Sequence, residues 1–487
     1  MAATRRHWLI LAVICVAYLM ITLDASVMNL ALPSAQQDLG FTNADRQWIV
    51  TSYLLSFGSL LLFGGRLADL IGRKVIFLTG LVGFAAASAV GGAATGFGML
   101  VSARACQGGF AALLAPAALS LLATTFSDPK DRGKAFGAFG AVAASGAGLG
   151  LIVGGALTST LSWRWCMYVN LVFAGIAIAG AVALLGRQGK TPGARLDVPG
   201  VLTAAGGMFC LVYGFSNAAT HGWGTPLTRV FLAAGGVLLV VFAFWQTRAA
   251  QPLLPPRVVL DRNRGGAYLT MLVLGAGIFG IFLFLIYFMQ TTLGYSAIVS
   301  GVALLPMVAA TAVGANVGNV ALMPRFGPKP LIAAGLLLAA VSMVLLTRIG
   351  LDSSYAAALL VPTIVAGVGM GLIYGGAADT GTSGVAPQDA GVASACLNVG
   401  QQLGGATGTA LLNTIAASAT TSYLSSHTPG PRTVQLAAIH SYTTVFWSAA
   451  GIFAAGAVVC GALLRPGPLT RPEQASAEER VAAGESA

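Results

Sequence analysis

Charged side chains are scarce in this sequence. Asp, Glu, Lys and Arg make up 8 % of its 487 residues, whereas soluble domains carry about 25 %. Hydrophobic residues make up 56 %, and the mean hydropathy is +0.82. Every glutamate lies in the polar stretch RPEQASAEERVAAGESA (471–487). This shortage of charge excludes a soluble globular protein and indicates an integral membrane protein.

Several kinds of functional motif are also missing. The six cysteines lie in apolar segments without C-x-x-C spacing or a neighbouring histidine, which argues against disulfides and a metal site. The sequence has no G-x-x-x-x-G-K-[ST] motif and no soluble domain large enough for a nucleotide. A set of nucleophile, base and acid is absent too, so an enzyme is disfavoured. We expect no cofactor, and the energy for any transport would come from a proton gradient.

Long apolar stretches fill nearly the whole chain, each close to the roughly 20 residues that a membrane-spanning helix needs. Alternating segments of ~10 residues, typical of membrane barrels, are absent. The sequence therefore predicts an all-α integral membrane protein with fourteen transmembrane helices and both termini on the same side. The predicted spans are residues 8–30, 47–64, 75–95, 98–123, 135–158, 165–186, 198–218, 228–247, 266–289, 298–321, 330–349, 356–380, 390–416 and 442–464.

The distribution of basic residues orients these spans. Of the 26 Lys and Arg residues, five lie in the loops of one side or at the span ends next to them, and Arg104 lies deep within a span. The others lie on the side that holds both termini, and the positive-inside rule makes that side cytoplasmic. Membrane topology then explains the net charge of +11 without a nucleic-acid partner.

An internal repeat divides the chain. Three motifs recur in the same order at offsets of 254 to 258 residues: LGFT (39–42) as LGYS (293–296), IGRK (71–74) as FGPK (326–329), and DRGKAFGAFGAVAASGAGLG (131–150) as DAGVASACLNVGQQLGGATG (389–408). The offset equals eight predicted spans. Residues 1–190 and 251–465 would then be two pseudo-symmetric six-helix halves, 191–250 a central two-helix insertion, and 466–487 a polar cytoplasmic tail. Parallel halves with a substrate site between them are typical of secondary transporters.

The loop between the second and third predicted spans reads GRLADLIGRK (65–74). Gly65 and Gly72 permit a tight turn between two helices, and Asp69 is placed to cap a helix amino terminus. Arg73 and Lys74 suit ion pairs that form in one conformation only. An ordinary basic loop is the alternative. In this G-x-L-A-D-x-x-G-R-K form the chain resembles the major facilitator superfamily, which implies that the loop is a conformational latch.

Four further stretches narrow the resemblance to the fourteen-span drug:proton antiporter family of that superfamily. They are LDASVMNLALP (23–33), with Asp24, Asn29 and Pro33 at matching positions; LVSARACQGGFAA (100–112), with Arg104, Gln107 and Gly108; SWRWCMYVN (162–170); and YGFSNAATHGW (213–223). The resemblance covers nearly the whole chain. It implies the major-facilitator fold and export of antibiotics or other toxic compounds in exchange for protons.

The fifth predicted span departs from that family's antiporter signature. In GAGLGLIVGG (146–155), Ala147 and Leu151 stand where the signature has the prolines to which a helix kink and a proton seal are attributed. The remaining glycines keep small-xxx-small spacing, which predicts close helix packing. They are Gly146, Gly150, Gly154 and Gly155. The departure leaves a proton-coupled symporter or uniporter of a small metabolite open as an alternative to an exporter.

Besides Arg229 and Arg348, which each lie next to the outer end of a span, three charged residues fall inside predicted spans: Asp24, Arg104 and Asp379. Asp24 and Arg104 lie at similar depth, and a carboxylate that can lose its proton beside a guanidinium that cannot is suited to proton coupling. A structural role in helix packing is the alternative for each. Asp379, near the cytoplasmic end of the twelfth span, is either a second proton or cation site or an acid solvated at the membrane interface.

Polar and aromatic side chains on the central spans are candidates for substrate binding between the halves. For any one of them, a hydrogen bond between packed helices is the more common role. His221 and Trp223, in an outer loop, suit surface packing better than a metal site. The candidates are Asn29, Tyr53, Gln107, Tyr287, Gln290, Asn316, Asn319, Tyr374, Asn398, Gln401 and Gln402.

Together these features predict a secondary active transporter of the cell membrane that exports an amphipathic drug or antibiotic by proton antiport with alternating access. Its expected partners are the amphipathic small molecule, protons and the lipid bilayer, and we expect it to function as a monomer. A transporter-like membrane sensor is a further alternative. A static receptor, however, would not need the latch loop or the Asp24–Arg104 pair.

Overall fold

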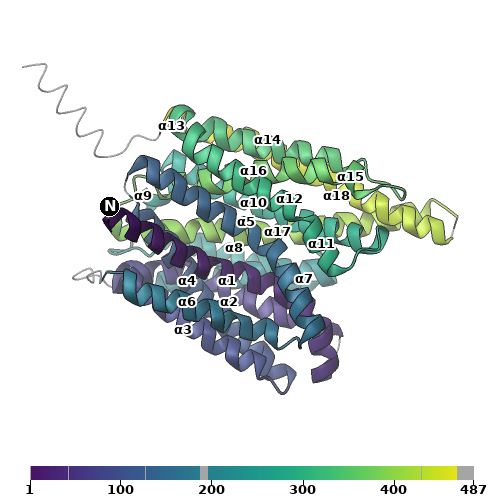
Figure 1. The fold of residues 1–487 in the computed structure, drawn as a ribbon, viewed down its shortest axis with the longest axis horizontal. Coiled ribbons are helices and arrows are strands. Elements are labelled where there is room, and N and C mark those ends of the chain that lie inside the picture. The colour runs from purple at the N-terminus through teal and green to yellow at the C-terminus, as the bar shows by residue number, and fades with distance from the viewer. Residues whose placement is uncertain (1, 42, 127, 187–195, 429, 469–487) are drawn as a thin grey trace, which may run out of the picture.

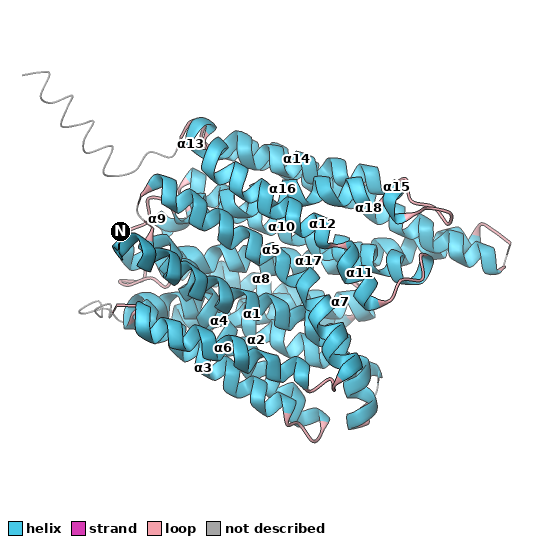
Figure 2. Ribbon diagram, in the orientation of Figure 1, coloured by secondary structure: helices cyan, strands magenta, loops and turns pink. Residues whose placement is uncertain are grey.

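The protein is an elongated bundle of helices (Figure 1). Nearly all of the described residues are helical, and none of them lies in a strand (Figure 2). The computed structural model describes residues 2–41, 43–126, 128–186, 196–428 and 430–468.

The bundle has two ends, here called the inner end and the outer end. The inner end contains Arg73 and Gly391, and both the start of α1 and the end of α18 lie there (Figure 1). The outer end is the opposite one and contains Asp45 and His221.

The amino-terminal part of the chain forms six long helices. In it α1 packs on α5 and α6, while α4 packs on α2 and α3. These helices are α1 (Ala2–Leu39), α2 (Asn43–Ile71), α3 (Arg73–Gly92), α4 (Phe97–Thr125), α5 (Pro129–Thr160) and α6 (Trp165–Leu184).

Two helices follow, α7 (Val198–His221) and α8 (Pro226–Gln246), which pack on each other. Asp197 closes this pair at the inner end, because its carboxylate accepts hydrogen bonds from Trp245 Nε1 at 2.8 Å and Gln246 Nε2 at 2.9 Å. Burial raises the pKa of Asp197, but these bonds and those from two backbone N–H groups outweigh burial and hold the pKa below its usual value. In addition, α7 packs on α2 and on α17.

The carboxy-terminal part is more broken than predicted. The tenth predicted span is interrupted after Ala303, where Pro306 starts a new helix, and the twelfth is interrupted at Leu359. The elements are α9 (Pro256–Val259), α10 (Arg262–Tyr287), the π-turn η1 (Phe288–Thr292), α11 (Ala297–Ala303), α12 (Leu305–Asn316), the π-turn η2 (Val317–Leu322), α13 (Met323–Phe326), α14 (Pro328–Leu346), α15 (Tyr355–Ala358), α16 (Leu360–Thr382), the 3-10 turn η3 (Pro387–Asp389), α17 (Ala390–Ser425) and α18 (Pro431–Leu463).

The sequence repeat has a counterpart in the backbone. Gly72 precedes α3 with φ of 112°, and Gly327 precedes α14 with φ of 78°. A residue with a side chain rarely adopts these angles, so glycine permits the same sharp reversal in both loops.

Twelve helices within the described ranges are long and apolar enough to cross a membrane. The number is thirteen if the two segments of α5, bent by 42°, form one span. α17 is not among them, since polar residues such as Gln401 and Gln402 lower its hydropathy. Helix length and composition alone therefore do not establish the predicted number of fourteen.

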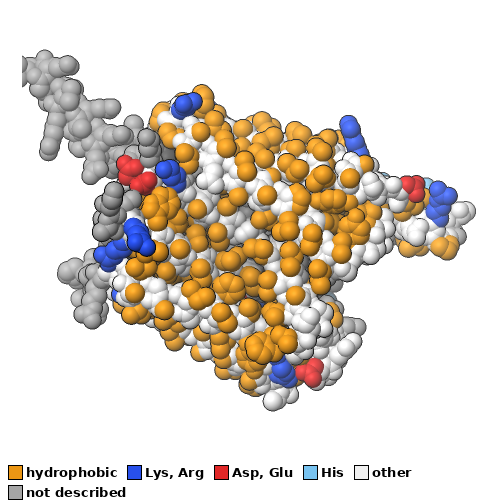
Figure 3. All heavy atoms as spheres, viewed as in Figure 1, with side chains coloured by type: hydrophobic (Ala, Val, Ile, Leu, Met, Phe, Trp, Pro, Cys, Tyr) orange, Lys and Arg blue, Asp and Glu red, His pale blue; other side chains and the backbone are white. Residues whose placement is uncertain are grey.

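The surface is that of a multi-pass membrane protein. Hydrophobic side chains cover the middle of the face in Figure 3, while Lys and Arg lie toward its ends. Large apolar side chains point outward, including Val240 at 70 % and Val458 at 72 % exposure. Exposed apolar area on this scale is stable only where lipid or a partner covers it.

Candidate functional site

Asp24 of α1 and Arg104 of α4 meet in the interior of the first six helices. Arg104 Nη1 donates to Asp24 Oδ2 at 2.6 Å, and each residue is only 1 % exposed. The structure thus brings together the two residues that the sequence placed at similar depth. A buried charge of either sign would be costly alone, and here each neutralises the other.

Three buried polar side chains complete the surroundings of this pair. Gln107 Nε2 donates to Asp24 Oδ1 at 2.9 Å, and Asn170 Nδ2 donates to the same oxygen at 2.7 Å. Both amides also donate to Ser88 Oγ, at 2.7 and 3.3 Å. We call Asp24, Ser88, Arg104, Gln107 and Asn170 the Asp24 network. In this network the Asp24 carboxylate accepts hydrogen bonds from side chains of α4 and α6.

The guanidinium of Arg104 has further partners on α2. It lies over the ring of Tyr53, 4.4 Å from the centroid, and its Nε donates to Ile49 O at 3.4 Å. Tyr53 Oη and Asn170 Oδ1 are buried without a hydrogen-bond partner among the described residues. Buried polar groups are normally satisfied, so these two atoms mark places where a water molecule or a substrate group would be favourable.

The glycines of α5 hold this helix against the part of α1 that carries Asp24. A methyl group on Gly146 would lie 2.0 Å from the Thr22 side chain, and one on Gly154 would lie 3.0 Å from the Val27 backbone. The bend of 42° in α5 occurs between Ala143 and Gly148 without a proline in that stretch. Close packing involves two helices: Gly146, Gly150 and Gly154 face α1, and Gly155 faces α11.

The loop after α2 reaches across to α17 at the inner end. Asp69 Oδ1 accepts from Gly391 N at 2.8 Å and Asp69 Oδ2 from Val392 N at 3.1 Å, so Asp69 caps α17. Gly65 permits this approach, because a methyl group there would lie 2.5 Å from Gly391 O. Arg73 lies 3.6 Å from the Asp69 carboxylate.

Lys74 takes a different place from Asp69 and Arg73. Its Nζ donates to Val182 O at 3.2 Å and to Leu185 O, at the inner end of α6. It therefore supports a helix end within the first six helices instead of bridging to α17.

Asp379 of α16 is buried and paired. Arg132 Nε of α5 donates to Asp379 Oδ1 at 2.5 Å, and Arg132 Nη2 donates to Thr382 Oγ1 at 2.9 Å. Asp379 is 5 % exposed, so a solvated acid at the membrane interface is the wrong description. A third contact at the inner end joins Arg66 to Asp389 at 3.9 Å.

The predicted substrate-binding residues do not form one cluster. Tyr53 and Gln107 belong to or touch the Asp24 network, whereas Gln401 Nε2 donates to Tyr374 Oη between α17 and α16. Asn398 Oδ1 accepts from Tyr18 Oη at 3.3 Å, which joins α17 to α1.

The remaining candidates are less well placed. Asn319 is buried and donates to a carbonyl of its own helix, while Asn316 and Tyr287 are exposed. Gln290 and Gln402 are half-buried, and the Asn29 side chain lies outside the described residues.

Sequence reasoning assigned no role to Ser88, Asn170, Arg132 or Tyr18. Asn170 was detectable as the polar end of SWRWCMYVN within an apolar span. Arg132 lies in a repeated motif, but its position near a span end made it resemble an ordinary basic loop residue. Ser88 and Tyr18 carry no such signal.

A family model described as Major Facilitator Superfamily matches residues 14–409. The chain belongs to this superfamily. It is 47 % identical over 462 residues to the puromycin resistance protein pur8 of Streptomyces alboniger, and the matched region covers 94 % of this chain and 92 % of pur8. It is 40 % identical over 414 residues to the cephamycin export protein CmcT of Amycolatopsis lactamdurans, covering 84 % and 85 %.

The fold of this superfamily member also matches solved structures. The structure of the proton:xylose symporter XylE has a TM-score of 0.65 to this chain, with 14 % identity, and covers 96 % of this chain and 97 % of its own. Superfamily membership and the transporters among the relatives identify the protein as a membrane transporter of small molecules and not an enzyme.

Proposed function

We propose that this transporter exports an amphipathic antibiotic or related toxic compound in exchange for protons, as a monomer of the fourteen-span drug:proton antiporter family. The relatives named for puromycin resistance and cephamycin export support the substrate class. A proton gradient supplies the energy, with no cofactor. The inner end faces the cytoplasm and holds both termini, in line with the excess of Lys and Arg there.

Fourteen spans follow if α5 and α17 also cross the membrane. α17 begins at the inner end, where Asp69 caps it, and α18 returns from the outer end. A helix of 36 residues that connects the two ends is long enough to span. Its polar residues are tolerated because it packs on α2, α10 and α18.

The Asp24 network is the observation that carries proton coupling. The contacts of Asp24 described above all come from donors, which suits an ionised carboxylate. Protonation removes the charge that holds Arg104 and places an O–H group against the N–H groups of Gln107 and Asn170. At least one hydrogen bond must then break. A proton at Asp24 therefore favours a different arrangement of α1, α4 and α6.

Helix α5 is suited to transmit that change. Its glycines pack on α1 beside Asp24, and its inner end carries Arg132, which pairs with Asp379 of α16. A shift of α1 thus reaches the contacts between the two groups of helices. Alternating access requires such contacts at the inner end to open and close in each cycle.

The substrate is expected next to this network. Tyr53 combines an aromatic ring with a buried unpaired hydroxyl, a combination that recognises an amphipathic molecule. A cationic substrate that contacts Tyr53 competes with the proton on Asp24, because both positive charges are attracted to the same carboxylate, and this competition is the thermodynamic basis of antiport.

Everted membrane vesicles test this function. Puromycin added to acidified vesicles should release protons from the lumen, read as recovery of acridine-orange fluorescence. Asp24→Asn should abolish the response. Asp352→Asn, the same change at an exposed acid, is the matched control. Normal coupling in Asp24→Asn rejects the role of Asp24, and puromycin-driven proton entry instead of release identifies a symporter.

A further inference from the structure

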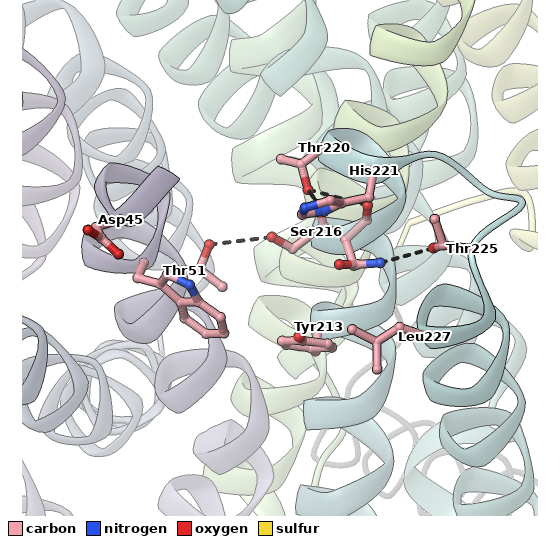
Figure 4. A pocket seen from close by; sticks show the side chains of 10 residues that line it. Asp45, Thr51, Tyr213, Ser216, Thr220, His221, Thr225 and Leu227 are labelled. Carbon is pink, nitrogen blue, oxygen red and sulfur yellow. Dashed lines mark hydrogen bonds between the residues drawn. The ribbon is translucent and has the colours of Figure 1, made fainter. Parts of the chain in front are cut away.

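A cavity lies at the outer end of the molecule. Its volume is about 380 Å³, within the ~300–1,000 Å³ range of small-molecule sites. The outer turns of α2 and α7 and the turn into α8 form its walls (Figure 4). None of the described residues that line it belongs to the Asp24 network or to the inner-end contacts.

Aromatic rings form part of the lining. Trp48 of α2 and Tyr213 of α7 have ring centroids 6.0 Å apart, and Phe231 packs against Tyr213 at 4.3 Å. Trp48 is 37 % exposed, so part of its ring is open to a ligand. Such rings can stack on a flat molecule and attract a cation to their faces.

The rest of the lining is mainly polar. Asp45 supplies a carboxylate, and Thr51 and Ser216 supply hydroxyl groups that meet at 3.3 Å across the two helices (Figure 4). His221 Nδ1 is bonded to the Thr220 hydroxyl at 2.8 Å. A carboxylate near aromatic rings selects positive ligands over neutral ones.

The cavity lies where two parts of the molecule meet. Trp223 Nε1 donates to Thr414 Oγ1 at 2.7 Å and so ties the outer end of α7 to α17. The other wall, α2, belongs to the first six helices and meets α17 at the inner end through Asp69. A ligand in the cavity therefore touches both a helix of the first six and a helix that is tied to α17.

We propose that this cavity is a second ligand site, separate from the Asp24 network, and that it takes planar aromatic cations. Opening of the inner end tilts the first six helices and moves the outer turns of α2 toward α7. A bound ligand opposes that movement. The site does not depend on proton coupling.

Equilibrium dialysis of ethidium, a planar aromatic cation, against the full-length protein in nanodiscs tests the site. Trp48→Leu and Tyr213→Leu each remove one ring, and each should weaken one class of ethidium site at least about tenfold. Trp165→Leu is the matched control, because Trp165 is 48 % exposed at the start of α6 and lies outside the cavity. Asp45→Asn should weaken the binding of ethidium but not the binding of phenanthridine, its neutral parent ring.

Several results would overturn the site. One is unchanged ethidium binding in both ring variants. Another is loss of all ethidium binding in Asp24→Asn, because the ligand then occupies the Asp24 network. Equal effects of Asp45→Asn on ethidium and phenanthridine reject the preference for cations. If vesicles show no proton coupling while ring-dependent binding persists, the proposed function fails and the site stands.

A separate experiment tests whether a ligand in the cavity opposes opening of the inner end. Asp379→Asn removes an inner-end contact and favours the open inner end. By reciprocity, ethidium at the cavity should then bind about fivefold more weakly. Unchanged affinity at the ring-dependent site overturns this part of the proposal, and Asp352→Asn serves as the control.

Discussion

Two of the buried carboxylates, Asp24 and Asp379, differ in the helices that they connect. The contacts of Asp24 come from α4 and α6, within the first six helices. The partner of Asp379 is Arg132, from a helix of the first six across the boundary to α16. Both acids are paired with arginine, yet only the second pair must break if the two groups of helices separate at the inner end.

The two acid–arginine pairs can therefore have different roles, although their chemistry is similar. An ion pair inside one rigid group can hold or release a proton without itself joining the groups. A pair across the boundary acts as a contact that one conformation has and another lacks. The sequence repeat places Ile278 at the position that corresponds to Asp24, 254 residues earlier. An apolar side chain cannot form a second ion pair inside the other group of helices. Under the proposed function, proton coupling at Asp24 and closure of the inner end at Asp379 are therefore separated in space.

The largest expected effect comes from breaking the pair inside the first six helices. Arg104→Gln leaves Asp24 buried without its counter-charge, and removal of one partner from a buried pair costs about 3–5 kcal/mol. The double variant Asp24→Asn/Arg104→Gln removes both charges and should recover most of that loss. Thermal unfolding of the purified variants, followed by tryptophan fluorescence, measures both.

A double-mutant cycle completes this prediction. The sum of the single losses should exceed the loss in the double variant by more than about 1 kcal/mol, because the two residues are in contact. Additive losses would mean that Asp24 and Arg104 do not interact energetically, and the contrast with Asp379 would disappear.

Breaking the pair across the boundary should act on conformation more than on folding. Asp379→Asn leaves Arg132 with the Thr382 hydroxyl and a backbone carbonyl, so we expect a loss of about 2 kcal/mol. Spin labels at Lys134 and Arg325, both exposed at the inner end, report the separation by electron–electron distance measurements. The long-distance population should rise in Asp379→Asn.

The control for this prediction is Asp24→Asn in the same labelled background, with native cysteines replaced. It should abolish proton coupling, with a smaller effect on inner-end separation than Asp379→Asn. An equal rise in both variants would contradict the separation of roles.

The cap on α17 should have a smaller effect in the same direction. Asp69→Asn retains one acceptor for the two backbone N–H groups of Gly391 and Val392, and loss of a cap costs about 1 kcal/mol. We expect a measurable shift toward the open inner end, below that of Asp379→Asn. A larger shift would make the α2–α17 contact the dominant closure.

The sequence was sufficient to find charged residues that lie deep within a predicted span. Asp24 and Arg104 stood out because charge is rare in apolar helices, and GRLADLIGRK indicated a turn that would place Asp69 at a helix end. It could not identify the partner of Asp379, since no local pattern links residues 247 positions apart.

Helix faces were a second obstacle to prediction from sequence. Asn316 and Asn319 are three residues apart, yet one is exposed and the other buried. Breaks in the tenth and twelfth spans arise from tertiary packing and proline placement, which a hydropathy pattern does not resolve.

The smallest expected effect concerns Ser88, the member of the Asp24 network that contacts Gln107 and Asn170 but is not bonded to Asp24 itself. Ser88→Ala removes the acceptor of one N–H bond from Gln107 and one from Asn170, while both amides keep their bonds to the carboxylate. A neutral hydrogen bond contributes about 0.5–1.5 kcal/mol, so stability should fall only slightly. Because Gln107 and Asn170 are then oriented less firmly, the initial rate of puromycin-driven proton release should fall slightly while inner-end distances stay unchanged. A rise in inner-end separation would place Ser88 with the closing contacts and show that the network and the boundary are mechanically one unit.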